Sequence, residues 1–297
     1  MDECPQPARE TAHRLDARAP HRRPTFVTAS LGYLDGSTPR PVSHMYDPPD
    51  GTPKDNCRFD FRAMQVVDAR GLAGTTSVHR EGFELWYAPS SVADFHDAPA
   101  VVGTYHAECA ALACAATGGS SAIVFDHQVR QREAGRPPLT FGRGGGSRPG
   151  GVGRVHNDYS EASGRRRLGL VLRDAALASR VRRFCIVNVW RSIRGAIVDT
   201  PLAVCDARSV SRRELVAGEI RYADRQGEIY LFRHSPAHRW YYYPGMDRDE
   251  ALVFKQFDSQ VGGVARFTPH AAFDLPDIPA DAPLRESIEA RCLVLFD

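Results

Sequence analysis

The chain has 297 residues, of which 42% are hydrophobic and 25% charged, and its formal net charge at pH 7 is +2. This length allows one large domain or two small ones and is enough to bury a core. The charge is too small to predict a nucleic-acid or anionic-membrane surface. No apolar run approaches the roughly 18 residues that a membrane span needs.

The N-terminal segment and the cysteines indicate the domain organisation and the cellular compartment. Residues 1–24 are rich in Arg, His and Pro and lack the apolar centre of a signal peptide. We expect a flexible lead-in over residues 1–24, followed by a single domain over residues 25–297. The 7 cysteines are scattered and contain no CxxC pair, which is poor spacing for a zinc site or a disulfide framework. They predict reduced, mostly buried thiols in a cytoplasmic protein.

The first half of the chain alternates strand-like segments with one clear helix. Runs of β-branched and aromatic residues, bounded by turn signals, predict strands at residues 25–34, 63–70, 81–87 and 121–126. An Ala-rich segment over residues 101–117, closed by two glycines, predicts a helix. Residues 91–97 are expected to form one helical turn.

In the second half, a helix is expected over residues 163–183, and its many arginines indicate a solvent-facing side. Short strands are predicted after it at residues 184–190, 196–198, 202–205, 219–222, 229–234, 240–243, 251–257 and 288–296. Many short strands with turn signals between them favour a mainly β fold, a barrel or jelly roll with flanking helices.

A Gly/Arg/Ser/Pro loop covers residues 142–153. It is similar in composition to segments that bind RNA, but it is short and isolated. A mobile loop beside an active site is the favoured interpretation.

His156 and Asp158 follow this loop and lie two residues apart in a segment expected to be extended. Side chains at this spacing on a strand point to the same side, so they can bind one metal ion together. A third ligand must then come from far along the chain, and His270 is the best candidate. Two histidines and one carboxylate leave three coordination positions open, as in non-haem Fe(II) oxygenases.

The His156–Asp158 pattern is a weak signal by itself. With 11 histidines and 36 acidic residues, such pairs arise by chance, and the other two are His79-x-Glu81 and His106-x-Glu108. The second of these falls in the predicted helix, where residues i and i+2 do not face each other. The first is not excluded by geometry, and His270 taken alone is better explained as a surface histidine after a proline.

Arg285 and Ser287 lie two apart at the beginning of the last predicted strand and therefore share a face. A guanidinium with a neighbouring hydroxyl can bind a carboxylate through two hydrogen bonds. Oxygenases that use 2-oxoglutarate need such an anchor for its distal carboxylate. Arg291 on the same strand is the competing anchor, and the plain alternative for Arg285 is a solvent-exposed charge at a strand edge.

Sequence runs spread over about residues 26–296 resemble one known family. The runs are residues 68–70, 80–85, 124–127, 155–160, 188–191, 201–207, 240–246, 254–259, 268–270 and 285–289. They are similar to the CmcJ/AsaB-type hydroxylase/desaturase family of bacterial cephamycin clusters and fungal secondary-metabolite clusters. In this family Glu81 belongs to a strand motif rather than to a metal site.

The resemblance implies a double-stranded β-helix, a cupin-like jelly roll, that binds Fe(II) and 2-oxoglutarate. It implies His156, Asp158 and His270 as the iron ligands, and Arg285 with Ser287 as the cosubstrate anchor. It further implies hydroxylation or desaturation of a small secondary metabolite. The most specific expectation is 7α-hydroxylation of a cephalosporin in cephamycin biosynthesis, where a CmcI-type methyltransferase partner completes a methoxyl group.

Further side chains are candidates for contacts around the iron. Trp190, Tyr241, Tyr242 and Tyr243 are expected to line the pocket, although aromatic residues on strands more often fill a core. Asn188 and Arg191 are candidates for contacts with the metal ligands or the substrate.

Three alternatives stay open at the level of the sequence. The enzyme could act on an unrelated natural product. The chain could instead be a non-catalytic partner subunit of a methyltransferase/oxygenase complex. It could also be a cupin-like metal-binding module that uses no cosubstrate.

Overall fold

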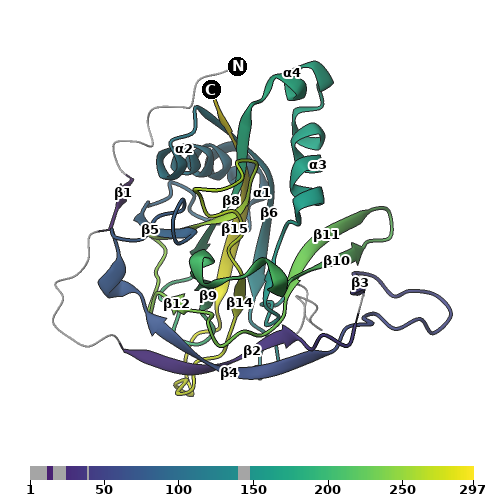
Figure 1. Ribbon diagram of the computed structural model, residues 1–297. Helices are drawn as coiled ribbons and strands as arrows, with labels where there is room; N and C mark the ends of the chain where they lie inside the picture. Colours follow the sequence, from purple (N-terminus) through teal and green to yellow (C-terminus); the bar gives the residue numbers. More distant parts are fainter. Residues whose placement is uncertain (1–11, 16–24, 39, 140–147) are drawn as a thin grey trace.

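The computed structural model describes residues 12–15, 25–38, 40–139 and 148–297. Within these ranges the chain forms two curled sheets with the main helices packed outside them, which confirms the predicted jelly roll (Figure 1). An apolar cluster that includes Phe83, Trp190, Val204 and Phe254 lies between the two sheets.

The first sheet contains the longest strands of the C-terminal half. Its described strands, in spatial order, are β1 (His13–Arg14), β5 (Phe83–Tyr87), β13 (Glu250–Asp258), β8 (Arg183–Ser192), β15 (Glu286–Phe296) and β6 (Ser121–Gln131). All of their pairings are antiparallel. Helix α2 (His106–Thr117) packs on one face of this sheet, against β6 and β15. The opposite face of the sheet is therefore directed into the barrel.

The second sheet is more strongly curled. Its described strands, in spatial order, are β2 (Phe26–Leu34), β4 (Phe59–Asp68), β12 (Trp240–Tyr242), β9 (Leu202–Cys205), β14 (His270–Ala272), β7 (His156–Asn157), β11 (Gln226–Phe232), β10 (Leu215–Arg221) and β3 (Val42–His44). The curl brings Gly32 of β2 into a bridge with Arg154, next to β7. Two short strands from distant parts of the chain, β7 and β14, thus become neighbours near the centre of the sheet.

The helices differ from the sequence prediction in two places. The helix predicted over residues 163–183 is wrong as a single element, because Arg173 adopts a left-handed conformation (φ 55°) and ends α3 (Glu161–Leu172). The side chain of Asp174 then caps a separate helix, α4 (Ala175–Arg180).

The helix predicted over residues 101–117 is confirmed but begins earlier. It starts with α1 (Ala98–Ala100), capped by Asp97, and continues through a π-helical stretch (Val101–Tyr105) into α2. Residues 91–97 form bends and a turn rather than a helical turn. The remaining described helices are single 3₁₀ turns, at Arg70–Leu72, Ala207–Ser209 and Arg212–Glu214.

The strand predictions are confirmed for most segments, with β9 matching residue for residue. The strand predicted at residues 196–198 is wrong, since this segment is irregular. The lead-in is not uniformly without structure, because β1 pairs with β5 and Arg14 forms an ion pair with the buried Glu84. The rest of the lead-in and residues 142–147 of the Gly-rich loop lie outside the described residues. No helix within the described ranges is long and apolar enough to cross a membrane.

Helix α3 is held to the barrel through a glycine, which gives a prediction with a matched control. A Cβ at Gly164 would lie 2.4 Å from the ring of Phe257, whereas a Cβ at Gly169 in the same helix would meet nothing within 4 Å. We expect Gly164→Ala to lower the free energy of unfolding by about 1–3 kcal/mol through overpacking. Gly169→Ala should raise it by about 0.5–1 kcal/mol because alanine loses less backbone entropy in a helix. Chemical denaturation of both variants measures the two opposite signs, and equal effects would contradict the close packing at Gly164.

Candidate metal centre

The three predicted ligands meet in the structure. His156 on β7 and His270 on β14 are directly paired across the two strands, and Asp158 follows β7 by one residue. The ligand atoms of the three side chains all lie within 4.8 Å of one another. Asp158 Oδ1 is 3.6 Å from His156 Nε2 and 3.8 Å from His270 Nε2. One ion can therefore contact all three atoms.

Backbone carbonyls orient both imidazoles. His156 Nδ1 lies 2.8 Å from the carbonyl oxygen of Arg154, and His270 Nδ1 lies 3.1 Å from that of Thr268. A carbonyl only accepts, so each Nδ1 carries the proton and each Nε2 presents a lone pair. Both Nε2 atoms face Asp158, which is the orientation that metal-binding histidines need.

The carboxylate of Asp158 is oriented in the same way. Its Oδ2 accepts hydrogen bonds from Asn188 Nδ2 and from Arg291 Nε, both at 2.9 Å. Its backbone N–H donates to Gln256 Oε1 at 2.8 Å. One carboxylate oxygen is thus held by the protein, and the other, Oδ1, is presented toward the two histidines.

Electrostatics favour the deprotonated form of all three ligands. Burial opposes the charge on Asp158, but Arg291 and the two histidines outweigh it and hold the pKa of this carboxyl well below its usual range. Burial, reinforced by His270, lowers the pKa of His156 to about 3, and burial also lowers the pKa of His270. At neutral pH the cluster is one carboxylate with two neutral imidazoles. This donor set fits a divalent transition metal.

Asn157 holds the two ligand strands together, a role that the sequence did not reveal. It is fully buried, and its Oδ1 accepts from the backbone N–H of Thr268 at 3.0 Å, two residues before His270. Its Nδ2 donates to the carbonyl oxygen of Gln256 at 2.8 Å. The only signal in the sequence was its place between His156 and Asp158.

The predicted carboxylate anchor lies beside β15, whose inward side chains continue toward the metal ligands. Arg285 is 3% exposed, and its Nη1 donates to the carbonyl oxygen of Thr200 at 2.9 Å. Arg285 Nε and Ser287 Oγ are both buried, and neither has a hydrogen-bond partner within the described ranges. Leaving such groups without a partner costs about 1–3 kcal/mol each. A bound carboxylate would satisfy both, so these residues fit the distal end of 2-oxoglutarate.

Arg291, the competing anchor, is already engaged. Its guanidinium contacts Asp158, Asp126 and Glu289 through three different nitrogen atoms, at 2.8–2.9 Å. These contacts stabilise the ligand carboxylate and leave Arg285 as the better candidate for the anchor.

Two of the other candidates on β8 lie on opposite faces of that strand. Asn188 faces the barrel and contacts Asp158. Arg191 points to the other face, where its Nε donates to Tyr105 Oη at 3.1 Å and its Nη1 to the carbonyl oxygen of Ala88 at 2.7 Å. It therefore does not reach the metal ligands or the cavity beside them, which corrects the expectation of a ligand or substrate contact.

The aromatic candidates pack into apolar clusters. Trp190 and Tyr243 are buried in the cluster between the sheets, and Tyr241 packs against it, whereas Tyr242 belongs to a second cluster on the curled sheet. None of the four lines the cavity that contains His156 and Asp158. The structure gives them the core role that aromatic residues on strands usually have.

That cavity has a volume of about 650 Å³ and opens beside His156, Asp158 and Arg291. Its walls include several residues that the sequence did not single out, among them Gln128, Arg130, Tyr159, Arg167 and Arg225. Strand β6 continues to Gln131, so Gln128 and Arg130 lie on the same face as Asp126. This alternation is the one signal in the sequence that could have placed them in the cavity.

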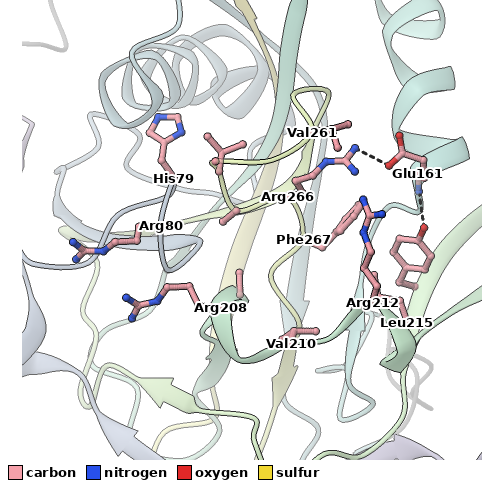
Figure 2. A pocket seen from close by; sticks show the side chains of 15 residues that line it. His79, Arg80, Glu161, Arg208, Val210, Arg212, Leu215, Val261, Arg266 and Phe267 are labelled. Carbon is pink, nitrogen blue, oxygen red and sulfur yellow. Dashed lines mark hydrogen bonds and ion pairs between the residues drawn. The ribbon is translucent and has the colours of Figure 1, made fainter.

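A second cavity, of about 770 Å³, lies elsewhere on the molecule. Figure 2 shows Arg80, Arg208, Arg212 and Arg266 around it, with Arg266 paired to Glu161 at 2.6 Å. None of the three candidate metal ligands lines it. The cavity in Figure 2 is therefore not the one that contains the candidate metal ligands.

Asn188 offers a test of how the carboxylate is held. We expect Asn188→Ala to weaken binding of a divalent metal by about ten- to a hundredfold, because Asp158 loses a hydrogen bond that orients it. Isothermal titration with Mn(II) measures the affinity. Gln128→Ala is the control, since Gln128 lines the same cavity and no hydrogen bond joins it to Asp158 in the described structure. Equal losses in both variants would mean that Asn188 has no specific orienting role.

Comparisons with known proteins agree with this chemistry. A family described as an oxidoreductase/YMDC permease-like domain matches residues 31–295. The hydroxylase/desaturase CTB9 of Cercospora beticola is 33% identical over 260 residues, 81% of this chain and 78% of that protein. The alpha-ketoglutarate-dependent dioxygenase phiK of Fungal sp. (strain ATCC 74256) is 31% identical over 249 residues, 80% of this chain and 85% of that protein. Among solved structures, the iron and alpha-ketoglutarate-dependent endoperoxidase NvfI matches with a TM-score of 0.79 and 25% identity, over 92% of this chain and 98% of that one.

Proposed function

Because the chain belongs to the family of Fe(II)/2-oxoglutarate-dependent hydroxylases and desaturases, we propose that His156, Asp158 and His270 bind its Fe(II) and that Arg285 and Ser287 bind the distal carboxylate of 2-oxoglutarate. The observation that carries the assignment is the convergence of two oriented Nε2 atoms on one carboxylate oxygen. The unsatisfied donors of Arg285 and Ser287 support the proposed binding of the distal carboxylate of 2-oxoglutarate.

When bound, iron and 2-oxoglutarate supply the activation of O2 for the oxidation of a C–H bond. The side chains of the protein supply position and environment. Asn188 and Arg291 hold Oδ2 of Asp158 through hydrogen bonds, which would leave Oδ1 free to hold the metal. Phe254 packs edge-on against His270, with ring centroids 4.9 Å apart, and closes the side of the site that faces the apolar cluster. Excluding water there protects a reactive centre from side reactions.

We propose a small secondary metabolite as the substrate. The relatives named above are fungal enzymes, with NvfI coming from Aspergillus novofumigatus, and their names cover hydroxylation, desaturation, dioxygenation and endoperoxidation. The sequence resemblance to cephamycin-cluster enzymes adds 7α-hydroxylation of a cephalosporin, followed by a CmcI-type methyltransferase partner, as the most specific candidate. Only the resemblance supports that candidate, so a broader screen of natural products belongs beside it.

Two further proposals concern the whole chain. Both sheets mix strands from the two halves of the chain, which supports one domain over residues 25–297. The six cysteines within the described residues are all free thiols and five of them are buried, which supports a reducing compartment such as the cytoplasm.

Anaerobic reconstitution tests the proposed function. We expect one Fe(II) per chain, a visible charge-transfer band that appears only when 2-oxoglutarate is added, and succinate release once O2 is admitted. Iron binding without any response to 2-oxoglutarate would instead identify a metal-binding module that uses no cosubstrate. Absence of iron binding would favour a non-catalytic partner subunit.

A further inference from the structure

The cavity beside the candidate metal ligands is lined by both apolar and charged side chains. Its lining includes the exposed Arg166 and Arg225, and we call their side of the cavity the mouth. Its lining includes the buried Val152, Ile220 and Ile229, together with the more exposed apolar side chains of Met45 and Leu170. Helix α3 lies over the β10–β11 hairpin (Figure 1). Arg166 and Arg167 of α3 and Arg225 of the hairpin turn contribute to the cavity walls from these two sides.

Positive charge exceeds negative charge in this cavity. Among the residues that the structure describes, five arginines line it, against the three carboxylates Asp126, Asp158 and Glu228. Asp158 is assigned to the metal, and Asp126 is paired with Arg291. Glu228 receives a hydrogen bond from Ser160, the residue that caps α3. Asp126 and Glu228 therefore already have a partner, and the side chain of Asp126 is 55% exposed.

The arginines of the mouth have little to neutralise them. Within the described ranges, no carboxylate lies at ion-pair distance from Arg166 or Arg167. In the described part of the chain, the one carboxylate near Arg225 is that of Asp224, its neighbour in sequence, at 3.6 Å, and both side chains are largely exposed. A pair of this kind contributes little.

Aromatic rings fix the positions of two of these guanidinium groups. Arg167 lies 5.1 Å from the ring centroid of Phe125 and 5.6 Å from that of Tyr159, and its Nε is buried without a hydrogen-bond partner in the described structure. Arg225 lies 4.1 Å from the ring centroid of Tyr222. Such contacts orient a guanidinium without neutralising its charge. Both groups are therefore prepared for an anion.

The cosubstrate does not account for these charges. The proposed anchor, Arg285 with Ser287, does not line this cavity. The two negative charges of 2-oxoglutarate are matched by the two positive charges of Fe(II), so binding of the pair leaves the excess at the mouth unchanged.

We propose that the substrate is a small molecule with an apolar body and a carboxylate. Arg167 and Arg225 bind the carboxylate at the mouth of the cavity, and the apolar body of the substrate extends toward the iron. This inference rests on the proposed function for the place of the reaction. It adds the substrate class and two residues that determine specificity. The acidic group would fix which carbon of the substrate faces the metal.

Two matched fluorescent probes test the inference without any turnover. The anionic probe is 8-anilinonaphthalene-1-sulfonate, and the neutral probe is N-phenyl-1-naphthylamine, which has the same rings without the sulfonate. Both are titrated into the full chain, with and without Fe(II) and 2-oxoglutarate under anaerobic conditions. We expect the Kd of the anionic probe to rise at least tenfold in the Arg167→Gln/Arg225→Gln variant, and that of the neutral probe to change less than twofold.

Arg212→Gln is the matched control, because Arg212 lines the other cavity (Figure 2). It should leave the affinity for both probes unchanged, and thermal melting should show that all variants are folded. Equal loss of both probes in the double variant, or an unchanged affinity for the anionic probe, would overturn the proposal. Because the titration also works without metal, a negative result in it is separable from failure of iron binding.

Discussion

Replacing Asp158 by alanine will abolish succinate formation from 2-oxoglutarate and lower the affinity for Fe(II) by more than about a hundredfold. Loss of a carboxylate that merely orients a ligand already costs about ten- to a hundredfold, and Asp158 is proposed as a ligand itself. Its Oδ1 is the atom on which both imidazoles converge, so no other carboxylate oxygen of the cluster can replace it. Iron content and succinate release, measured on the same preparation, check both effects.

The control for this variant is Asp126→Ala. Asp126 lines the same cavity and is bound to the same arginine, Arg291, but it is not among the three clustered ligands. It should keep iron and most of the activity. Because Asp158→Ala also removes a partner of the buried Arg291, Asp158→Asn provides a second variant that keeps the shape of the side chain. Normal turnover by either Asp158 variant would show that the metal assignment is wrong.

The alternation of side chains along a strand explains which candidate site residues could be grouped correctly from the sequence. His156 and Asp158 could be paired because side chains two apart on an extended segment share a face. The same rule separates Asn188 from Arg191, which are three apart on one strand and lie on opposite faces in the structure. Because of this alternation, only one of Asn188 and Arg191 can face the interior of the barrel.

The position of His270 depends on long-range pairing that no local pattern reveals. Strand β14 has three residues and β7 has two, which is too short for a periodic signal. They become neighbours because the second sheet curls and because Asn157 bonds across to Thr268. Resemblance to a family supplied what the local sequence could not. The basic mouth has no local signal for a similar reason, since Arg167 and Arg225 belong to separate elements and line one cavity only in the folded chain.

The inward faces of β15 and its neighbouring strands explain why the candidate metal ligands lie next to an apolar cluster. Glu289 lies opposite Gln128 on one neighbouring strand and opposite Trp190 on the other. Strands β8 and β13 contribute residues of both kinds, because Asn188 and Gln256 contact Asp158 whereas Trp190 and Phe254 belong to the cluster between the sheets. The candidate metal ligands thus border a packed apolar cluster, which His270 contacts through Phe254.

Replacing Arg285 by glutamine will raise the KM for 2-oxoglutarate by about a hundredfold or more while leaving Fe(II) binding unchanged. Hydrogen bonds to a charged group contribute about 1.5–3 kcal/mol each, and loss of two of them corresponds to at least a hundredfold in affinity. Ser287→Ala removes one donor and should raise the KM by about tenfold. Initial rates of succinate formation at increasing 2-oxoglutarate, together with an iron titration of each variant, separate the two kinds of defect.

Arg291→Gln is the decisive comparison, because it removes the competing anchor. Since Arg291 Nε donates to Asp158, we expect this variant to lose affinity for Fe(II) more strongly than affinity for 2-oxoglutarate. Arg285→Lys keeps the charge but loses the planar fork, so it should recover only part of the binding, and melting temperatures show whether loss of the bond to Thr200 affects folding. A raised KM in Arg291→Gln with an unchanged KM in Arg285→Gln would transfer the anchor to Arg291. The pattern we expect instead divides β15 by function: the guanidinium next to Asp158 orients an iron ligand, and the one six residues earlier binds the cosubstrate.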